Sequence, residues 1–308
     1  MRGKVVTVFG GSGFIGRHLI RRLAARGATI RVPARDVGTT YQLRPLGEVG
    51  QIVAMPTSLS EASIARAVEG ADFVVNLIGI LHGDFERLQA RLPGVIGAAA
   101  RAGGATRFVQ MSAIGADAAS RSRYARTKAE GEASALQSGP EVVILRPSIL
   151  FGPEDQFLNK FARMTRFAPA LPLIGGGTMR FQPVYVGDVA DAIVKALDGH
   201  AVDGQVYELG GPNIYTFKEL LEYLLRLLGR RRLLLNLPWS IAEIEARLFE
   251  LLPEPPFTRD QLLLLRLDNV VADGAAGLSD LGLAPTPLEA IVPAYLAPRA
   301  KHFRHSAI

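Results

Sequence analysis

Three glycines near the start of the chain constrain its fold more than any other feature. The apolar run Val5–Phe9 leads directly into Gly10, Gly13 and Gly16, and a helical pattern follows them. In this G-x-x-G-x-x-G spacing the first glycine permits a tight turn, the second lets backbone N–H groups approach a pyrophosphate, and the third lets the helix pack on the strand. Bound phosphates would lie at the positive end of the helix dipole. These residues therefore predict a dinucleotide-binding β-α-β unit.

Alternating apolar and helical patterns in the first half of the chain predict a parallel sheet covered by helices. Strands are expected over residues 5–9, 29–33, 52–55, 73–78, 108–112, 142–146 and 206–209. Helices are expected over 13–26, 60–69, 85–102, 122–137 and 189–197. The predicted fold class is α/β, a Rossmann-type doubly wound parallel sheet.

Proline and glycine become frequent after Pro147, which predicts a change of architecture there. We expect residues 1–147 to form an NAD(P)-binding Rossmann core. Residues 148–308 are expected to return one helix and one strand, at about 188–210, to that core, and otherwise to form a smaller, α-rich C-terminal lobe on the substrate side. Further helices are expected over 217–228, 241–251 and 259–267, with a proline-rich break at 253–256.

The composition of the 308 residues excludes several kinds of chemistry. There is no cysteine, so disulfides, thiolate metal sites, iron–sulfur clusters and a cysteine nucleophile are excluded. The five histidines are scattered, and no metal site is predicted. No apolar run reaches the roughly 18 to 20 residues of a membrane-spanning helix, and no signal-peptide pattern is present. These features favour a cytoplasmic protein, with a peripheral place on the inner membrane face as a further option. The net charge of +6 suits anionic partners, although a generally arginine-rich composition is the simpler explanation.

The end of the second expected strand indicates which dinucleotide binds. Arg35 and Asp36 follow it, about twenty residues after the last glycine of the turn. An acidic residue there binds the ribose hydroxyls of NAD, whereas arginine accommodates the 2′-phosphate of NADP. Arg35 comes first, and Arg17, directly after the turn, offers a second guanidinium suited to phosphate. NADP(H) is therefore favoured, and Asp36 keeps NAD(H) as the alternative. The remaining binding residues expected in the turn are Ser12, Phe14 and Ile15.

Tyr124 and Lys128 form a Y-x-x-x-K pair, whose spacing puts both side chains on one face of a helix. An ammonium four residues from a phenol favours phenolate, and is expected to lower the pKa of the tyrosine from about 10 toward the working range of a general acid. The phenol could then protonate a carbonyl oxygen as a nicotinamide delivers hydride, while the lysine also holds the nicotinamide ribose. We therefore expect both residues to be catalytic and cofactor-binding.

With these motifs the chain resembles the short-chain dehydrogenase/reductase superfamily, in its atypical, extended-like branch. Residues 75–79, after the fourth expected strand, belong to the resemblance. Further on, residues 151–162, 181–189, 257–260 and 277–282 look like the nucleotide-binding accessory subunits of respiratory complex I and their bacterial relatives, so that the resemblance covers nearly the whole chain. It adds Asn76, Gly79 and Pro147 to the expected cofactor-binding residues. It implies tightly held NADPH and a place beside membrane-bound quinone chemistry, without implying turnover.

Two positions depart from the superfamily pattern. Its dehydrogenases carry a serine or threonine after the fifth strand that hydrogen-bonds the substrate carbonyl, and Ala113 aligns there, with Ser112 one residue earlier. Losing such a donor costs about 2.7 to 4 kcal/mol of transition-state stabilisation in other enzymes, so turnover depends on whether Ser112 replaces it. Ser112 is kept as the third catalytic candidate. Thr57 stands where relatives carry an Asp or Asn that contacts adenine, which leaves that contact open.

Polar and basic residues of the second half have both structural and functional interpretations. Asn159 and Gln182 either line a ligand channel or bridge local backbone, and we favour the structural role. Asp188 is expected to be the N-cap of the helix that follows it. The basic run 230–232, followed by leucines 233–235, predicts either contact with an anionic bilayer or partner subunit, or a buried helix beside a solvated basic turn.

Several functions remain open from the sequence. The first is an NADPH-binding protein with little turnover, retained for cofactor binding, assembly or quinone-related metabolism, with a membrane-associated respiratory or quinone-biosynthesis complex as its partner. The second is an active NADPH-dependent oxidoreductase acting on a carbonyl, with Tyr124 as acid and Lys128 as its partner. The third is a cofactor-sensing regulator. Ala113 favours the first and the intact Y-x-x-x-K pair the second. Nucleic-acid binding is not expected, because the arginines are dispersed and no basic helix is interleaved with stacking aromatics.

Overall fold

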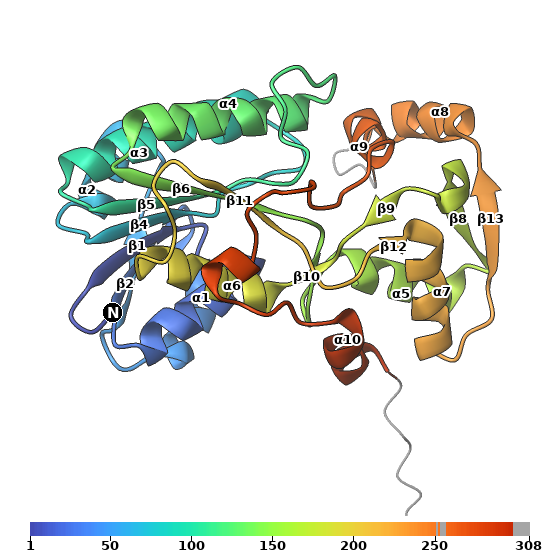
Figure 1. Ribbon diagram of the computed structural model, residues 1–308, viewed down its shortest axis with the longest axis horizontal. Coiled ribbons are helices and arrows are strands. Elements are labelled where there is room, and N and C mark those ends of the chain that lie inside the picture. The colour runs from blue at the N-terminus through green and yellow to red at the C-terminus, as the bar shows by residue number, and fades with distance from the viewer. Residues whose placement is uncertain (251, 253–256, 298–308) are drawn as a thin grey trace, which may run out of the picture.

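In the computed structural model, which describes residues 1–250, 252 and 257–297, the chain is built on a seven-stranded parallel sheet (Figure 1). The strands are β1 Val5–Phe9, β2 Thr29–Ala34, β3 Ile52–Pro56, β4 Phe73–Asn76, β5 Arg107–Met111, β6 Glu141–Pro147 and β11 Val206–Leu209. They lie in the order β3-β2-β1-β4-β5-β6-β11, and each neighbouring pair is parallel. From β1 the chain adds β2 and β3 on one side and then β4, β5, β6 and β11 on the other, so the strand order reverses between β1 and β4. Doubly wound sheets bind ligands at such a point. The predicted fold class is confirmed.

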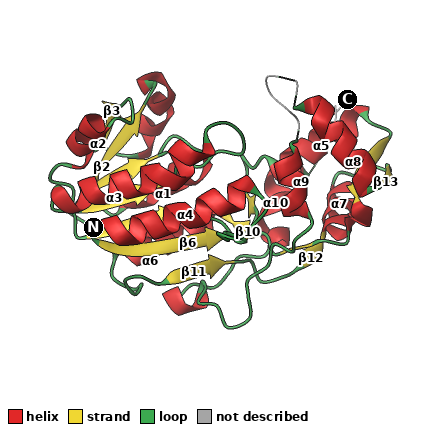
Figure 2. Ribbon diagram, turned by 90° about the horizontal axis from the view of Figure 1, so that it is seen from above, coloured by secondary structure: helices red, strands yellow, loops and turns green. Residues whose placement is uncertain are grey.

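Helices cover both faces of the sheet, which buries it on both sides (Figures 1 and 2). One face carries α1 Phe14–Ala25 and α6 Val186–Leu197, and the other carries α2 Glu61–Val68, α3 Leu92–Ala102 and α4 Arg123–Ser138. Side chains alternate along each strand, so Val8 of β1 packs with the α1 and α6 layer while Phe9 packs with the opposite layer. The strand sequences are therefore apolar at nearly every position.

A smaller lobe lies beyond the carboxyl ends of the strands, at the right of Figure 1. Its helices are α5 Phe157–Phe167, α7 Phe217–Leu227, α8 Trp239–Phe249, α9 Arg259–Leu265 and α10 Leu288–Leu296. Its paired strands are β7 Leu150–Phe151 with β10 Val184–Tyr185, β9 Arg180–Phe181 with β12 Tyr215–Thr216, and β8 Ala170–Ile174 with β13 Leu233–Leu237. The shorter helical turns are η1 Val37–Leu46, η2 Glu86–Arg91, η3 Gly175–Gly177 and η4 Ser279–Leu281. The lobe has a core of its own, in which the rings of Phe157, Phe161, Phe181 and Phe217 are in contact.

All the strands expected for the sheet form, and their ends differ from expectation by no more than two residues. β4 stops earlier than expected because the side chain of Asn76 accepts a hydrogen bond from the N–H of Ile78 at 3.1 Å, which turns the chain. The expected helix over 241–251 starts earlier, at Trp239. Residue 251, its expected end, and the proline-rich break at 253–256 lie outside the described residues.

The expected single helix over 85–102 is divided into the π-helical turn η2 and the α-helix α3. Pro93 lacks an N–H, so it cannot donate a hydrogen bond to the carbonyl of Gln89. That carbonyl faces α4 instead. A Cβ on Gly131 of α4 would lie 1.9 Å from that carbonyl oxygen, so only glycine allows the two elements to come this close. The π-helical turn thus brings α4 against its neighbour, and α4 is the helix that carries Tyr124 and Lys128.

The prediction that Asp188 is a helix N-cap is wrong. α6 begins at Val186, so Asp188 lies in its first turn, and its carboxylate accepts the N–H and O–H of Thr286 at 2.6 and 2.8 Å. Burial raises the pKa of this carboxyl, and the two bonds from Thr286 oppose the rise. Through these two bonds Asp188 links the C-terminal segment to the core. Asn159 and Gln182, by contrast, do bridge backbone groups, as favoured from the sequence: Asn159 donates to two carbonyls, and Gln182 joins Gly211 to Val271.

The buried helix expected after the basic run 230–232 does not form. Residues 233–237 form β13, which pairs in parallel with β8. Alternation along the strand turns Leu234 into the core of the lobe and leaves Leu233 and Leu235 68% and 54% exposed. The periodicity of a short leucine run does not distinguish a helix from a strand, and pairing with β8 decides it here.

Candidate cofactor and active site

The glycine turn between β1 and α1 is held tight on two sides. Gly10 has a φ of +75°, and a Cβ there would lie 3.1 Å from the carbonyl carbon of Leu77, at the end of β4. A Cβ on Gly16 would lie 2.3 Å from the carbonyl oxygen of Gly11, inside van der Waals contact. Gly13 is exposed, and a Cβ there would meet only the carbonyl oxygen of Gly10, at 3.1 Å. The turn is therefore open to a ligand at Gly13.

The first turn of α1 has the features of an anion-binding site. Its N-cap, Gly13, has no capping side chain, and no acidic residue stands in the first turn. The N–H groups of Phe14, Ile15 and Gly16 have no partner within the described residues, and the helix dipole is positive at this end. Ser12, in the same turn, is partly exposed. The next residue, Arg17, has a buried Nε with no hydrogen-bond partner among the described residues. These donors fit the phosphates of a dinucleotide.

Arg35 and Asp36 differ in how their charges are used. Arg35 is exposed at the end of β2, and no described residue pairs with its guanidinium. The carboxylate of Asp36 accepts the N–H of Gly38 at 2.8 Å, because Asp36 is the N-cap of η1. At this corner no described residue pairs with the cation, while one oxygen of the carboxylate is bound by its own turn.

The loop after β4 connects the glycine turn to α4. Asn76 is fully buried, donates to the side-chain oxygen of Gln110 at 2.8 Å and accepts from Ile78, so both ends of its amide are bonded within the protein. Gly79 is exposed, and a Cβ there would lie 3.3 Å from Nζ of Lys128. Asn76 therefore shapes the loop, and Gly79 passes next to the lysine.

Tyr124, Lys128 and Ser112 come together beside that loop. Nζ of Lys128 donates to the carbonyl oxygen of Met111 at 3.4 Å and lies 5.9 Å from the centre of the Tyr124 ring. Ser112 follows Met111, and its buried hydroxyl has no hydrogen-bond partner among the described residues. Burying a hydroxyl without a hydrogen bond costs free energy, and a hydrogen bond to a ligand would offset that cost. Pro147, the last residue of β6, is buried nearby and its carbonyl accepts the N–H of Ile114 at 3.1 Å.

The expectation that Lys128 lowers the pKa of Tyr124 is wrong. Burial raises the pKa of Tyr124 to about 12, because the phenolate loses its hydration there. Burial also lowers the pKa of Lys128 to about 8, although the nearby carboxylate of Glu132 opposes this. The tyrosine is thus a neutral phenol at neutral pH, able to donate a hydrogen bond but weak as an acid.

The side chains that hold α4 come from both the sheet and the lobe. On the sheet side, the carboxylate of Glu132 accepts two hydrogen bonds from Arg146 of β6, at 2.8 and 2.6 Å, and Arg146 also lies 3.6 Å from Glu208 of β11. The carboxylate of Glu132 is nearly buried, and a bidentate guanidinium partner offsets the cost of that burial.

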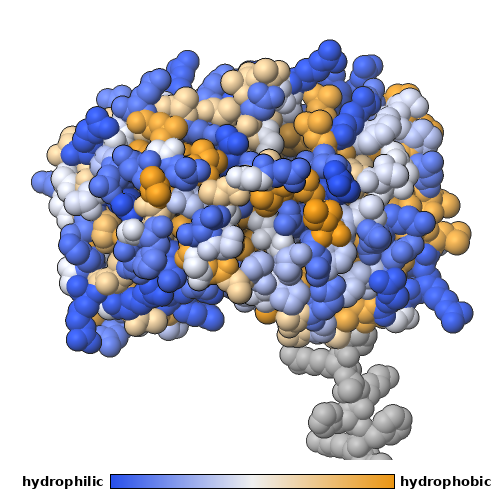
Figure 3. All heavy atoms as spheres, in the orientation of Figure 1, coloured by the Kyte–Doolittle hydropathy of each residue, from blue (hydrophilic) through white to orange (hydrophobic). Residues whose placement is uncertain are grey.

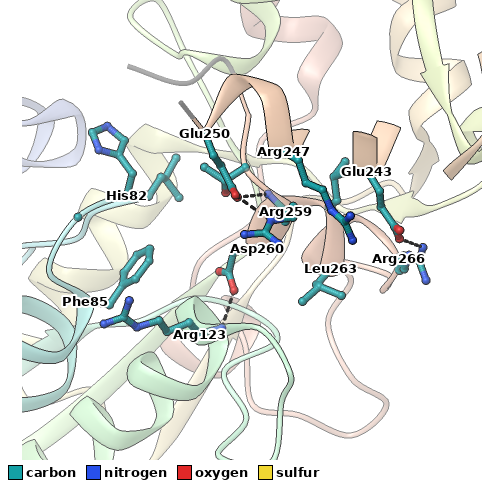
Figure 4. Close-up of a pocket in the computed structure, with 14 residues that line it drawn as sticks. His82, Phe85, Arg123, Glu243, Arg247, Glu250, Arg259, Asp260, Leu263 and Arg266 are labelled. Carbon is teal, nitrogen blue, oxygen red and sulfur yellow. Dashed lines mark hydrogen bonds and ion pairs between the residues drawn. The ribbon is translucent and has the colours of Figure 1, made fainter. Parts of the chain in front are cut away.

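On the lobe side, Asp260 of α9 caps the N-terminus of α4 (Figure 4). Its carboxylate accepts the N–H of Arg123 at 2.6 Å, the N–H of Tyr124 at 3.1 Å and the hydroxyl of Ser122 at 3.0 Å. A carboxylate at a helix N-terminus satisfies free N–H groups and interacts favourably with the dipole. A residue of the lobe thus bonds directly to the backbone of Tyr124.

A cavity of about 620 Å³ lies between the core and the lobe, next to this cap. Its walls come from residues 81–85 after β4, the start of α4, and α8 and α9 (Figure 4). Phe85, in the wall, contacts the Tyr124 ring edge-to-face at 6.3 Å. The volume is in the range of small-molecule sites, and the place beyond the strand ends is where a substrate would lie beside a dinucleotide.

Charged side chains and His82 also line the cavity. Arg259 pairs with Glu250 at 2.8 Å and Arg266 with Glu243 at 2.5 Å, whereas no described residue pairs with Arg247. Among the described residues, no group of three or more histidine, aspartate and glutamate side chains is arranged to hold a metal ion.

Sequence reasoning missed Asp260, Gln110 and the pair formed by Glu132 and Arg146. The start of α9 could have been found, because Thr258 and Gln261 form a capping box with the spacing of that motif. Nothing in the sequence indicates that Asp260 contacts α4, which is more than a hundred residues away. That contact depends on the packing of the lobe.

The chain belongs to the NAD dependent epimerase/dehydratase family, whose model matches residues 6–210, and as a member it is an NAD(P)-binding protein. It is similar to the NADH dehydrogenase [ubiquinone] 1 alpha subcomplex subunit 9 of Arabidopsis thaliana mitochondria, with 39% identity over 93% of this chain and 76% of the relative. It is also similar to a ceramide reductase of Caulobacter vibrioides, with 29% identity over 76% of this chain and 74% of that protein.

Among solved structures, a UDP-N-acetylglucosamine 4-epimerase from Methanobrevibacter ruminantium M1 matches with a TM-score of 0.71, covering 96% of both chains at 15% identity. At that identity the match shows the fold alone. It covers the lobe as well as the sheet, so that structure shares nearly the whole fold described here.

Replacing Lys128 with methionine is expected to change how stability depends on pH. The lysine has a pKa of about 8 in the folded protein and near 10.5 unfolded, so between these values the unfolded chain binds more protons and wild-type stability rises with pH. Lys128→Met lacks this rise. Urea unfolding should therefore show wild type gaining about 2 kcal/mol relative to the variant between pH 7.5 and 9.5. Parallel pH dependence in the two proteins would mean that Lys128 titrates in its ordinary range.

Asp260→Asn is expected to weaken both the fold and cofactor binding. The amide keeps one acceptor but loses the charge, so urea unfolding should show a loss of about 1 kcal/mol. Because the cap bonds to Tyr124 itself, the dissociation constant for NADPH, followed by its fluorescence, should also rise. Asp268→Asn is the control, since Asp268 likewise accepts a backbone N–H in the lobe, from Arg180 at 2.8 Å, but does not contact α4. Unchanged NADPH affinity in Asp260→Asn would reduce the cap to a purely structural role.

Proposed function

We propose that this protein holds NADPH tightly and serves an accessory role in a respiratory or quinone-related complex at the cytoplasmic face of a membrane, with little turnover. The observation that carries the proposal is the corner after β2, where the guanidinium of Arg35 is exposed and no described residue pairs with it. The accessory role is supported by the 39% identity to a subunit of mitochondrial NADH dehydrogenase over nearly the whole of this chain. Among the described residues no helix is both long and apolar enough to cross a membrane.

The cations at that corner support the preference for NADP over NAD. Asp36 accepts the N–H of Gly38 through one carboxylate oxygen, so the other oxygen could still bind the ribose hydroxyls of NAD. A 2′-phosphate instead needs cations, and Arg35 and the unpaired Nε of Arg17 are available for it. Charge-assisted bonds to a phosphate are stronger than neutral ones, which supports tight retention of NADPH.

Little turnover is supported by the acid–base groups. A phenol with a pKa of about 12 has a weak driving force for protonating a substrate, compared with an acid whose pKa lies near the operating pH. Ala113 has no side-chain donor for a carbonyl oxygen. Donors for the phosphates of the cofactor are present, while the groups that would drive proton transfer are poorly tuned.

The second candidate is an active NADPH-dependent reductase, and the unpaired hydroxyl of Ser112 favours it. In that case NADPH would supply hydride to a carbonyl carbon. Ser112 would donate a hydrogen bond to the carbonyl oxygen, and Tyr124 would pass its phenolic proton to that oxygen while Lys128 stabilised the phenolate. The cavity of about 620 Å³ beside Phe85 would hold the substrate, and the similarity to a ceramide reductase supports a reductive role.

Arg35→Ala tests the proposal. The variant should bind NADPH 10- to 100-fold more weakly, because a charged hydrogen-bonding partner of about 1.5 to 3 kcal/mol is lost, and should bind NADH as wild type does. Calorimetric titration of nucleotide-free protein with each cofactor measures both constants. The matched control is Arg66→Ala, an exposed arginine on α2. Equal, weak affinities for the two cofactors in wild type, or an equal loss of both in Arg35→Ala, would contradict NADP selectivity.

A further inference from the structure

Two segments of the lobe carry positive charge and no negative charge. Residues 156–181 and 223–242 each contain four lysines or arginines and no aspartate or glutamate. Together these two segments carry eight positive charges, so the rest of the chain, with a total net charge of +6, has a net charge of −2. Acidic residues elsewhere in the lobe balance most of this charge, so the basic character is local to these two segments.

Side-chain and backbone contacts bring the two segments together. Arg230 donates to the carbonyl of Ala162 at 3.0 Å and to the hydroxyl of Thr165, and Arg232 donates to the carbonyl of Thr165 at 3.0 Å. The N–H of Leu233 then bonds to the carbonyl of Pro169 at 3.2 Å, and β13 continues beside β8. The basic run therefore lies along the C-terminal end of α5.

The exposed cations of this region have few counter-charges. Arg163 and Arg166 on α5 and Arg231 before β13 are exposed, and no acidic side chain of the described residues pairs with them. Burial lowers the pKa of Lys160, and repulsion from Arg163 lowers it further. Three exposed arginines without an acidic partner among the described residues favour an anionic counterpart.

Large apolar side chains stand among these cations. Phe167, which ends α5, is 90% exposed, and Leu233 and Leu235 project from the same side of β13. Figure 3 shows hydrophobic and strongly hydrophilic side chains side by side over the end of the lobe where β13 lies. We call this surface, made of Arg163, Arg166, Phe167, Arg231, Leu233 and Leu235, the basic–apolar end.

We propose that the basic–apolar end docks the protein on the surface of an anionic lipid bilayer. Arginines attract acidic headgroups, while Phe167 and the two leucines can enter the boundary between headgroups and acyl chains. A nucleic acid would satisfy the arginines but leave the exposed apolar side chains against phosphates, so it fits this surface less well. The inference rests on the proposed function only for the membrane location, and specifies the surface and the lipid chemistry that provide it.

The test is co-flotation of the full chain with vesicles of phosphatidylcholine, with and without 30% phosphatidylglycerol, at low and high salt. We expect binding to the anionic vesicles alone, weakened by salt. Arg163→Gln/Arg166→Gln/Arg231→Gln should lower it by about a hundredfold, because each basic residue near an anionic surface contributes about fivefold. Phe167→Ala/Leu235→Ala should lower it about tenfold with the salt dependence unchanged.

Arg2→Gln/Arg66→Gln/Arg91→Gln is the control, because it removes the same charge from exposed positions of the core. An equal loss in this control, or binding to neutral vesicles, would overturn the proposal. So would tight, salt-sensitive binding of duplex DNA by a protein that does not float with vesicles, or self-association that the lobe variants abolish. NADPH affinity is measured on the same preparations: intact affinity with no vesicle binding rejects the docking surface alone, while vesicle binding with no NADPH affinity rejects only the cofactor assignment.

Discussion

The contact between Gly16 and the carbonyl oxygen of Gly11 is the constraint on which the rest of this structure depends. A Cβ on Gly16 would lie only 2.3 Å from that oxygen. No residue other than glycine therefore allows α1 to start so close to the end of β1. That approach directs the free N–H groups of the first turn toward the switch point between β1 and β4. It also sets α1 against the sheet, where α6 packs beside it. The anion site and the core thus have the same origin.

The second determinant is α4, because three parts of the protein hold it. The sheet holds it through Arg146 and Glu132, the π-helical turn packs against Gly131, and the lobe caps it with Asp260. Tyr124 and Lys128 therefore sit on an element whose position depends on the lobe as well as on the core. Anything that shifts α9, including a ligand in the cavity or a surface that docks the lobe, acts on the backbone of Tyr124 directly.

How much could be predicted from the sequence differs between core and lobe. The sheet, its strand ends and the glycine turn followed from local patterns, because buried parallel strands and a nucleotide turn impose their own residue types at short range. The Y-x-x-x-K spacing placed Tyr124 and Lys128 together, but their pKa values depend on burial, which spacing does not reveal. The role of Asp188 was misjudged because its partner, Thr286, is far away in sequence. In the lobe, β13 and the cap by Asp260 depend on long-range pairing that no local motif encodes.

We propose that the glycine turn, with Arg17 and Arg35, retains NADPH. Mass spectrometry of the nucleotide released when gently purified protein is denatured tests this most directly. The protein should release NADPH or NADP⁺ in near-stoichiometric amount and little NAD(H). Protein that releases no nucleotide, or that releases NAD(H) in its place, would contradict the proposal.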